Sequence, residues 1–217
     1  MKILSTKILA EYQKQPLIEA GFEVFENDFI ATKIKSFDLK NINESLIFTS
    51  QNAVESILQH PDLDKLKAKK VYCVGLKTKT MLADNGFEVI AYTGYASDLA
   101  EIITLIYKSE SFTFFSGNLR RDTLPDALKE AEVVFNEINV YETTLTPHKT
   151  KSPVDAILFF SPSGVESYLK ENTFKKEVCF CIGETTASAL ENKTKNIIIA
   201  DQPTIEDVIE AVIEEYK

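Results

Sequence analysis

The chain has 217 residues, a length that allows one large domain or two small ones. Its composition, 44% hydrophobic and 26% charged with seven glycines and seven prolines, excludes a disordered or fibrous protein. The net charge of −9 argues against a surface for nucleic acid or anionic membrane and favours a small-molecule partner.

The N-terminal segment MKILSTKILAEYQKQ reaches charged residues after only a few apolar ones. It cannot serve as the core of a signal peptide or as a spanning helix, so we expect a cytoplasmic protein. Cys73, Cys179 and Cys181 lie in apolar runs and are expected to be reduced, packed thiols. A metal site at Cys179 and Cys181 is disfavoured, because alternate residues of a strand point to opposite faces.

Short β-branched runs, each followed by a helical pattern, recur along the chain. The clearest predicted strands are KILST at 2–6, SLIFTS at 45–50, KVYCVG at 70–75, SFTFFSG at 111–117, DAILFFS at 155–161 and VCFCIG at 178–183. They lack alternation of apolar and polar residues, which favours parallel strands that are covered on both faces. The sequence therefore predicts an α/β fold.

Internal similarity divides the chain into two copies of one unit. LIFTSQNAVESIL at 46–58 returns as ILFFSPSGVESYL at 157–169, a shift of 111 residues. VYCVGLKTKTML at 71–82 similarly matches FCIGETTASAL at 180–190, and SDLAEII at 97–103 matches EDVIEAV at 206–212. We therefore expect two similar lobes, each a parallel sheet flanked by helices, with the function in the cleft that separates them.

Two extended runs, at about 23–34 and 133–145, are longer than a compact lobe needs. If the chain leaves one lobe along the first run and returns along the second, the two runs form a two-stranded antiparallel ladder. This interpretation predicts a discontinuous domain 1 of residues 1–32 and 144–217, a domain 2 of residues 33–143, and linker strands at about 28–35 and 137–144.

Five predicted strands end in small hydroxyl residues or glycine and run into a helix. The backbone N–H groups at a helix N-terminus favour carboxylate or phosphate, and ligands of open α/β sheets bind at the carboxyl ends of the strands. Helix capping is the default explanation of any one of these turns, but their repetition in two lobes predicts a polyanion site. Its candidate residues are Thr49, Ser50, Gln51, Asn52, Lys77, Thr78, Ser116, Gly117, Asn118, Arg120, Ser161, Pro162, Ser163, Gly164, Thr185 and Thr186.

Lys79 and Arg121 lie beside these turns and fit equally well as site cations or as solvated surface cations.

The chain has no GxGxxG, P-loop or GxSxG motif, and His60 and His148 each adjoin a proline. We therefore expect chemistry that relies on hydroxyls, backbone amides and positioning. Tyr141, in the run INVYETTL, is the candidate proton donor, although from the residues alone a strand aromatic packed in a half-buried sheet is its default explanation.

The segments IFTSQNAVES, VYCVGLKT, FSGNLRRDTLPDAL, VYET, FFSPSGVESYL, IGETTASAL and ADQPTIEDVIEAV together resemble uroporphyrinogen-III synthases, in family order over nearly the whole chain. The resemblance implies a cyclising hydro-lyase of heme and tetrapyrrole biosynthesis that needs no cofactor. Its substrate is hydroxymethylbilane, a linear tetrapyrrole polycarboxylate that loses water and closes with ring D inverted. Such an enzyme holds ring D by its carboxylates and so favours closure with inversion over closure without it. This is catalysis by positioning.

The resemblance also implies roles for individual residues. Tyr141 matches the tyrosine usually proposed as the proton donor of the family, while the family's carboxylate-binding turns supply the counterparts of Ser50, Thr78, Ser161, Thr185 and Thr186. Lys7 and Ile8 replace the arginine and proline that are common after the first strand, so a bidentate grip is not expected there, although Lys7 can still neutralise a carboxylate.

A two-lobed binding module that closes on a small anion without reaction is the alternative that we keep open. No output domain is visible in the sequence, and calorimetry against small anions would separate the two functions. We expect a monomer with no nucleic-acid or membrane partner. The family resemblance adds a transient hand-over of substrate from hydroxymethylbilane synthase.

Overall fold

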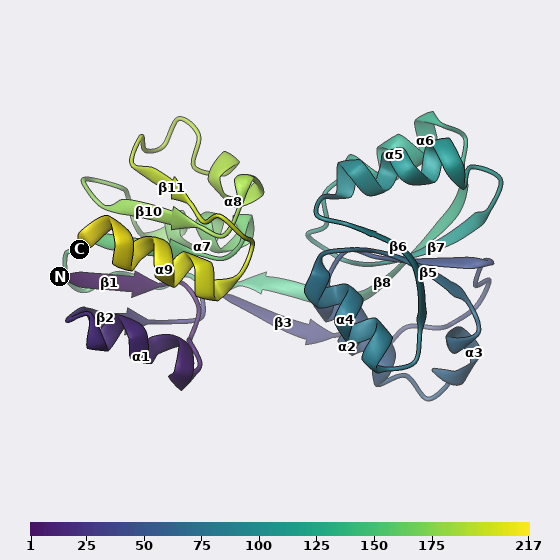
Figure 1. Cartoon of the computed structure of the whole chain (residues 1–217), viewed down its shortest axis with the longest axis horizontal. Helices are drawn as coiled ribbons and strands as arrows, with labels where there is room; N and C mark the ends of the chain where they lie inside the picture. Colours follow the sequence, from purple (N-terminus) through teal and green to yellow (C-terminus); the bar gives the residue numbers. More distant parts are fainter. The chain divides into compact units, whose positions relative to one another are not determined.

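A computed structural model describes residues 1–217 as an α/β protein made of two compact units. Unit 1 comprises Met1–Ala31 and Thr144–Lys217, and unit 2 comprises Thr32–Thr143 (Figure 1). The chain passes from unit 1 to unit 2 within β3 (Ile30–Ile34) and returns within β8 (Val134–Leu145). These strands pair antiparallel, since Lys35 N donates to Val140 O over 3.0 Å and Thr146 N donates to Phe29 O over 2.9 Å.

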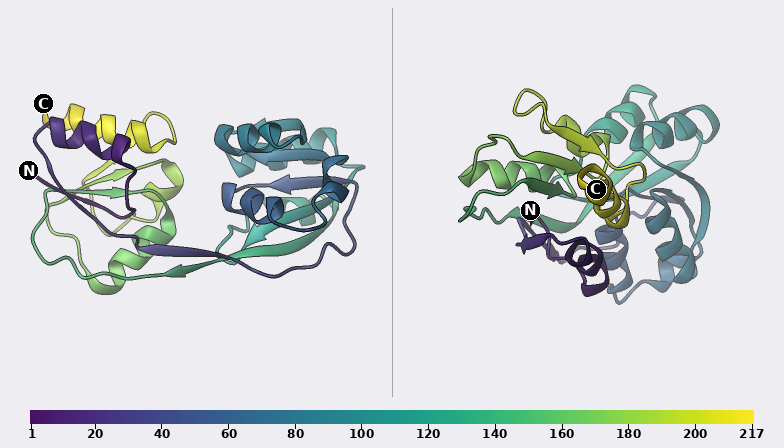
Figure 2. Two further views of the ribbon diagram at one scale, coloured as in Figure 1. Left: turned by 90° about the horizontal axis from the view of Figure 1, so that it is seen from below. Right: turned by 60° about the vertical axis from the view of Figure 1, so that its left-hand side comes forward.

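Unit 1 contains a five-stranded parallel sheet with the order β11-β10-β9-β1-β2. Two helices, α1 and α9, lie side by side on one face, and α7 and α8 cover the other (Figures 1 and 2). The elements of unit 1 are β1 (Lys2–Ser5), α1 (Glu11–Glu19), β2 (Glu23–Glu26), β9 (Ala156–Phe159), α7 (Pro162–Glu171), β10 (Val178–Cys181), α8 (Glu184–Ser188), β11 (Ile197–Ile199) and α9 (Ile205–Tyr216).

Unit 2 contains the sheet β3-β8-β7-β4-β5-β6, in which β4 to β8 pair in parallel. Helices α2, α3 and α4 cover one face, and α5 and α6 cover the other. The elements of unit 2 are β4 (Ser45–Phe48), α2 (Gln51–Leu58), α3 (Asp64–Lys67), β5 (Lys70–Val74), α4 (Leu76–Asp84), β6 (Glu88–Thr93), α5 (Ala96–Ile106), β7 (Ser111–Gly117) and α6 (Thr123–Glu130), besides β3 and β8.

The two sheets repeat one strand order, because β6-β5-β4-β7-β8 in unit 2 corresponds to β11-β10-β9-β1-β2 in unit 1. Equivalent helices follow equivalent strands: α2 after β4, for example, and α7 after β9. The structure thus confirms the α/β fold class, the six predicted strands and the internal duplication. The parallel pairing also explains why these strands have continuous apolar runs, since helices bury both of their faces.

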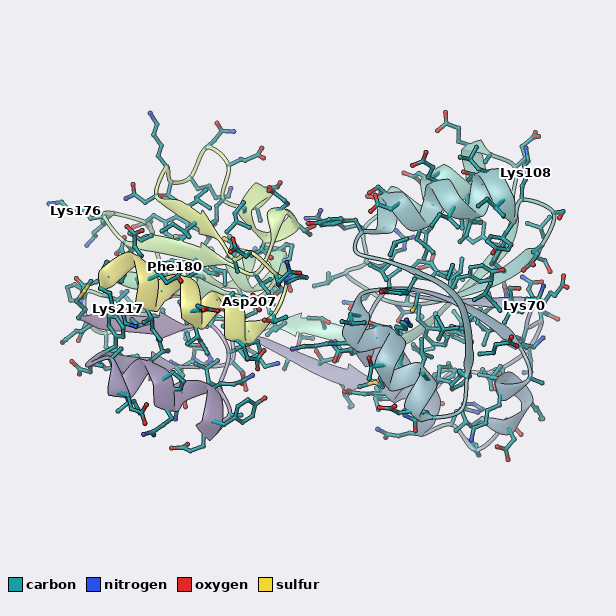
Figure 3. All side chains as sticks on the ribbon, viewed as in Figure 1. Lys70, Lys108, Lys176, Phe180, Asp207 and Lys217 are labelled. Atoms are coloured by element: carbon teal, nitrogen blue, oxygen red, sulfur yellow. The ribbon has the colours of Figure 1, made fainter.

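Successive side chains of one strand lie on opposite faces of the sheet and pack in different core clusters. In β4, Phe48 packs with α2 and α4, whereas Ile47 packs with α5 and α6 on the opposite face. In unit 1, Phe180 of β10 lies beneath α9 and packs with Val208 and Val212 (Figure 3). Every core cluster draws its residues from a single unit, so each unit has its own hydrophobic core.

The three cysteines are free and buried, as the sequence predicts. Burial raises the pKa of each thiol to about 12, which leaves all three as packed, unreactive groups at neutral pH. None of the helices combines the length and the apolar character that crossing a membrane requires.

Glu110 joins three strands at the amino edge of the unit 2 sheet. Its carboxylate accepts hydrogen bonds from Ser45 Oγ (2.5 Å) and Tyr72 Oη (3.1 Å) and forms an ion pair with Lys70 Nζ (2.8 Å), the lysine labelled in Figure 3. Burial raises the pKa of Glu110, but the hydrogen bonds from Lys70, Ser45 and Tyr72 outweigh burial, so its pKa lies below the usual glutamate value.

We expect Glu110→Gln to lower the free energy of unfolding by about 1–3 kcal/mol at pH 7, because three donors lose an ionised acceptor. Since the folded-state pKa is depressed, the stabilisation is present above the pKa of unfolded glutamate and is lost as pH falls through the folded-state value. Urea unfolding at pH 7 and pH 3 would measure a difference that shrinks at the lower pH. The exposed Glu101→Gln variant is the control, and a pH-independent difference would contradict the account.

Candidate functional site

The predicted hydroxyl-rich turns of unit 2 lie together at the carboxyl ends of the strands of its sheet. Strand β4 is flanked by β5 and β7, and all three run parallel, so their carboxyl ends lie side by side. The turn after β4 carries Thr49 and Ser50, the turn after β5 carries Gly75 and Thr78, and β7 ends at Gly117 and is followed by Asn118. Unit 2 therefore brings together three of the five predicted turns.

Unit 1 repeats this arrangement. Its strand β9 is flanked by β10 and β1, so the turn at Ser161 adjoins the turn at Gly183–Thr186 and the residues that follow β1. Thr186 is buried, Thr185 is half-buried and engaged in an interaction, and Lys7 is exposed. Each unit thus presents its own group of candidate residues.

The serines at the two equivalent strand ends cap helices. Ser50 Oγ accepts a hydrogen bond from Ala53 N (3.4 Å) at the start of α2, and Ser161 Oγ accepts one from Gly164 N (3.0 Å) at the start of α7. Each cap satisfies one N–H group. The N–H groups of the first helical residues still have no intrahelical acceptor, as at the start of any helix. Pro162 has no N–H, so in α7 the first such donor belongs to Ser163, whose hydroxyl lies 3.1 Å from Ser161 Oγ.

Two predicted residues, one near the end of β7 and one in the loop that follows it, make contacts within the protein. Asn118 forms a pair of hydrogen bonds with the backbone of Thr143: Asn118 Nδ2 donates to Thr143 O (3.0 Å), and Thr143 N donates to Asn118 Oδ1 (2.7 Å). Ser116 Oγ donates to Glu137 Oε1 over 2.5 Å. These contacts attach the loop to β8.

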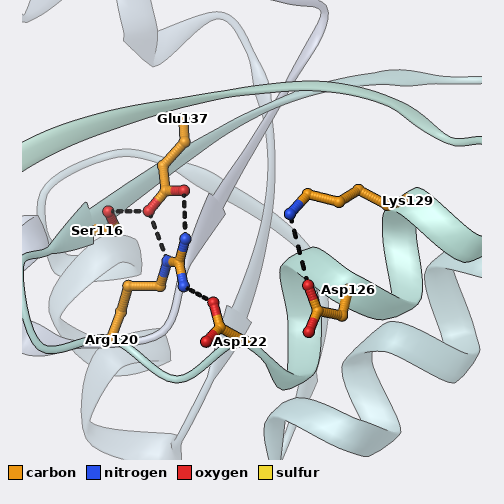
Figure 4. Close-up of polar contacts among 6 residues, drawn as sticks. All are labelled: Ser116, Arg120, Asp122, Asp126, Lys129 and Glu137. Atoms are coloured by element: carbon orange, nitrogen blue, oxygen red, sulfur yellow. Dashed lines mark hydrogen bonds and ion pairs between the residues drawn. The ribbon is translucent and has the colours of Figure 1, made fainter.

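Arg120 is held on both sides by carboxylates (Figure 4). Its Nε and Nη2 atoms donate to the two carboxylate oxygens of Glu137 over 2.8 and 3.0 Å, and its Nη1 contacts Asp122. The hydrogen bonds that Arg120 donates to Glu137 and Asp122 raise the pKa of Arg120. Burial raises the pKa of the Glu137 carboxyl, but the hydrogen bonds that it accepts from Arg120 and Ser116 outweigh burial, so its pKa lies below the usual glutamate value. The guanidinium predicted to bind substrate is therefore already neutralised within unit 2.

Tyr141 lies on β8 and packs directly on the backbone of Gly117 in β7. A Cβ atom placed on Gly117 would lie 2.3 Å from Tyr141 Cζ and 2.8 Å from its Oη. No side chain larger than hydrogen fits between the two residues. The tyrosine is half-buried and packs against the core cluster that contains Phe115 and Val140. Its ring therefore contributes to packing, which agrees with the explanation of Tyr141 as a strand aromatic in a half-buried sheet.

The other predicted cations have different surroundings. Lys79 Nζ lies 4.1 Å from the centroid of the Tyr92 ring, a cation–π contact. Lys77 and Arg121 are also engaged in interactions. Gln51 is exposed and Asn52 is half-buried at the start of α2. The local positive charge expected at these turns is thus partly taken up by neighbouring groups.

Sequence reasoning did not select three polar residues that lie beside the predicted site residues. Thr6 is buried beside Ser161 in unit 1, where its Oγ1 donates to Leu158 O over 2.7 Å. Glu137 pairs with Arg120, and Asn139 Oδ1 is buried without a hydrogen-bond partner. Thr6 ends the predicted first strand, and this position could have identified it as a site candidate from the sequence. Glu137 and Asn139 could not be identified in this way, because only the pairing of β7 with β8 brings them beside the predicted residues.

A hollow of about 550 Å³ lies elsewhere in unit 1, against the loop that precedes β9 and the end of α7. Its lining includes Lys149, Val154 and Asn172, and it lies at the amino edge of the sheet, opposite the candidate turns. No group of three or more His, Cys, Asp or Glu side chains is arranged to hold a metal ion.

Comparison with known proteins gives the family. The sequence model described as uroporphyrinogen-III synthase HemD matches residues 11–210, almost the whole chain. The chain belongs to the uroporphyrinogen-III synthase family.

Individual relatives of this uroporphyrinogen-III synthase family agree with the match. A curated uroporphyrinogen-III synthase of Chlorobaculum parvum is 28% identical over 170 residues, which cover 67% of this chain and 68% of the relative. The crystal structure of uroporphyrinogen-III synthetase from Helicobacter pylori 26695 matches with a TM-score of 0.74 at 23% identity and covers 99% of both chains. A mutant uroporphyrinogen III synthase from the extremely thermophilic bacterium Thermus thermophilus matches with a TM-score of 0.74 at 15% identity over 100% of both chains. At these identities the two solved structures show the shared fold.

Proposed function

We propose that the chain is a cyclising lyase that removes water from hydroxymethylbilane and closes it with inversion of ring D to give uroporphyrinogen III. The observation that carries this proposal is the family match over residues 11–210. The repeated hydroxyl- and glycine-containing turns support it, because the substrate is a polycarboxylate and each unit has adjacent strand ends of a kind that can bind anions.

In the first step the C–O bond of the hydroxymethyl group breaks, driven by the electron pair of the adjacent pyrrole nitrogen. The leaving oxygen takes a proton from the phenol of Tyr141 and departs as water. The pyrrole N–H proton then passes to the phenolate, which restores Tyr141 and leaves a neutral azafulvene. A phenol is a hydrogen-bond donor suited to this role. The Tyr141 ring is fixed against Gly117, so its hydroxyl has a defined position from which to donate.

In the second step the substituted carbon of ring D attacks the electrophilic azafulvene carbon and forms a spiro intermediate, which fragments and recloses with the ring inverted. The free bilane closes without inversion, so the protein's main contribution is to hold ring D in the orientation that leads to inversion. We assign the binding of acetate and propionate side chains to turns within each unit, those of Ser50 and Thr78 in unit 2 and those of Ser161 and Thr186 in unit 1, where helix N–H groups and hydroxyls can bind carboxylates.

The proposal includes a monomer in the cytoplasm that receives its substrate from hydroxymethylbilane synthase. A transient hand-over shortens the time in which the free bilane can close by itself, which is the physical reason to expect it. The proposed steps use only groups of the substrate and of the protein.

The reaction is tested by adding freshly prepared hydroxymethylbilane to the chain and following its disappearance. We expect consumption well above the spontaneous rate. A protein that binds the bilane in calorimetry but leaves its lifetime unchanged would instead be the binding module that the sequence alone allowed.

A further inference from the structure

Strand β8 has an irregular register beside Tyr141. Ser116 pairs with Asn139, but the next residue of β7, Gly117, pairs with Tyr141, so Val140 is an additional residue in β8. Such a β-bulge changes which face of the sheet the following side chain occupies. As a result both Val140 and Tyr141 pack against the same core cluster, whereas in a regular strand neighbouring residues would face opposite sides.

A bulge interrupts the ladder that would otherwise hold Tyr141 in place, and β7 ends at Gly117. The side chain of Asn118 continues the ladder beyond this point. It donates to the carbonyl and accepts from the N–H of one residue, Thr143, as a backbone partner in an antiparallel pair would do. Thr143 lies two residues after Tyr141 and is buried, so the amide fixes the strand immediately after the phenol.

The strand is also fixed before the phenol. Glu137 of β8 accepts from Ser116 and from two nitrogens of Arg120, which ties β8 to the loop that carries Asn118 (Figure 4). Tyr141 is therefore bracketed by a charged anchor at Glu137 and an amide anchor at Thr143, with Gly117 beneath its ring. At the amide anchor one side chain both donates to and accepts from a single residue, whereas at the charged anchor Ser116 and Arg120 only donate to Glu137.

We propose that Asn118 is a positioning residue for Tyr141: its paired hydrogen bonds to Thr143 hold the bulged segment of β8 so that the phenol stays seated on Gly117. This inference rests on the role proposed for Tyr141. The same residues that the sequence suggested as ligands of the substrate, Ser116, Asn118 and Arg120, thus act by shaping the strand that carries the proton donor.

The test uses Asn118→Ala and Asn118→Asp in the full chain. Asn118→Ala removes both hydrogen bonds, and we expect kcat to fall by about 10- to 100-fold with little change in KM, as a small displacement of a reacting group can cause. Asn118→Asp keeps the bond from Thr143 N but places a carboxylate against Thr143 O, and we expect a smaller but measurable loss. Asn172→Asp is the matched control, because Asn172 also bridges backbone groups, His148 O and Thr150 N, but in unit 1.

A double-mutant cycle separates positioning from general damage to the fold. In a Tyr141→Phe background we expect Asn118→Ala to cost almost no further activity, because there is no donor left to position. An equal fold-loss in both backgrounds would overturn the inference.

Ring NMR of Tyr141 provides a readout that does not depend on the reaction. We expect Asn118→Ala to shift the Tyr141 ring resonances and Asn172→Asp to leave them in place. Unmoved resonances would contradict the positioning role. Moved resonances together with full activity of Tyr141→Phe would show that Asn118 seats the ring but that the catalytic role of Tyr141 is wrong, so the two failures are distinguishable.

Discussion

Replacing Tyr141 by phenylalanine is expected to lower turnover of hydroxymethylbilane by about 10²- to 10⁴-fold, the range typical for loss of a general acid. The substitution removes one oxygen and keeps the ring that packs on Gly117 and against the unit 2 core. Because the ring remains, we expect the free energy of unfolding to change little. Single-turnover measurements would show the loss in the dehydration step.

Tyr107→Phe is the matched control for this experiment. Tyr107 is a half-buried tyrosine of unit 2 whose ring packs on Tyr72, at the end of the sheet where Glu110 joins the strands. Its loss of a hydroxyl should leave turnover unchanged. Full activity in Tyr141→Phe would remove Tyr141 from the mechanism and leave positioning by the turns as the whole of the catalysis.

The duplicated phenylalanines Phe48 and Phe159 give the second large expected effect. Each is fully buried at the end of an equivalent strand, Phe48 stacked on Phe115 with ring centroids 5.1 Å apart and Phe159 packed edge-to-face on Tyr168 at 5.6 Å. Truncation of a buried phenylalanine to alanine costs about 3–5 kcal/mol. Since no core cluster draws on both units, we expect Phe48→Ala to destabilise unit 2 and Phe159→Ala to destabilise unit 1.

Residue-resolved hydrogen exchange measures this directly, because it reports the opening free energy of each strand. Phe48→Ala should reduce amide protection in β4, β5 and β7 and leave β9 and β10 protected, and Phe159→Ala should give the reverse. The two variants are controls for each other. Equal loss of protection in both sheets from either change would mean that the units unfold as one.

Much of the fold could be predicted because burial on both faces leaves a strong signal. Six strands with continuous apolar runs were predicted within a few residues of their bounds. The similarity of 46–58 to 157–169 predicted two equivalent strand–helix units, in which Ser50 and Ser161 cap the helices. The strands that were not singled out carry weaker patterns: β11 has three residues, and β2 and β6 are only half-buried. Edge strands bury less surface, so their sequences are less constrained.

The candidate site was less predictable, because its geometry depends on contacts between segments far apart in the sequence. Arg120 looks like a cation for substrate until Glu137, 17 residues further on, is seen to neutralise it. Asn118 looks like a turn residue until its pairing with Thr143 is known. The bulge at Val140 shifts Tyr141 by one position in the register, and no residue of the run INVYETTL predicts this bulge.

The isomer composition of the product tests the central claim most directly. The chain is incubated with freshly prepared hydroxymethylbilane, the products are oxidised, and the type I and type III isomers are separated and compared with a protein-free incubation. We predict type III as the main product with the chain and type I without it. Type I alone in both incubations would contradict the account, because closure without inversion needs no enzyme.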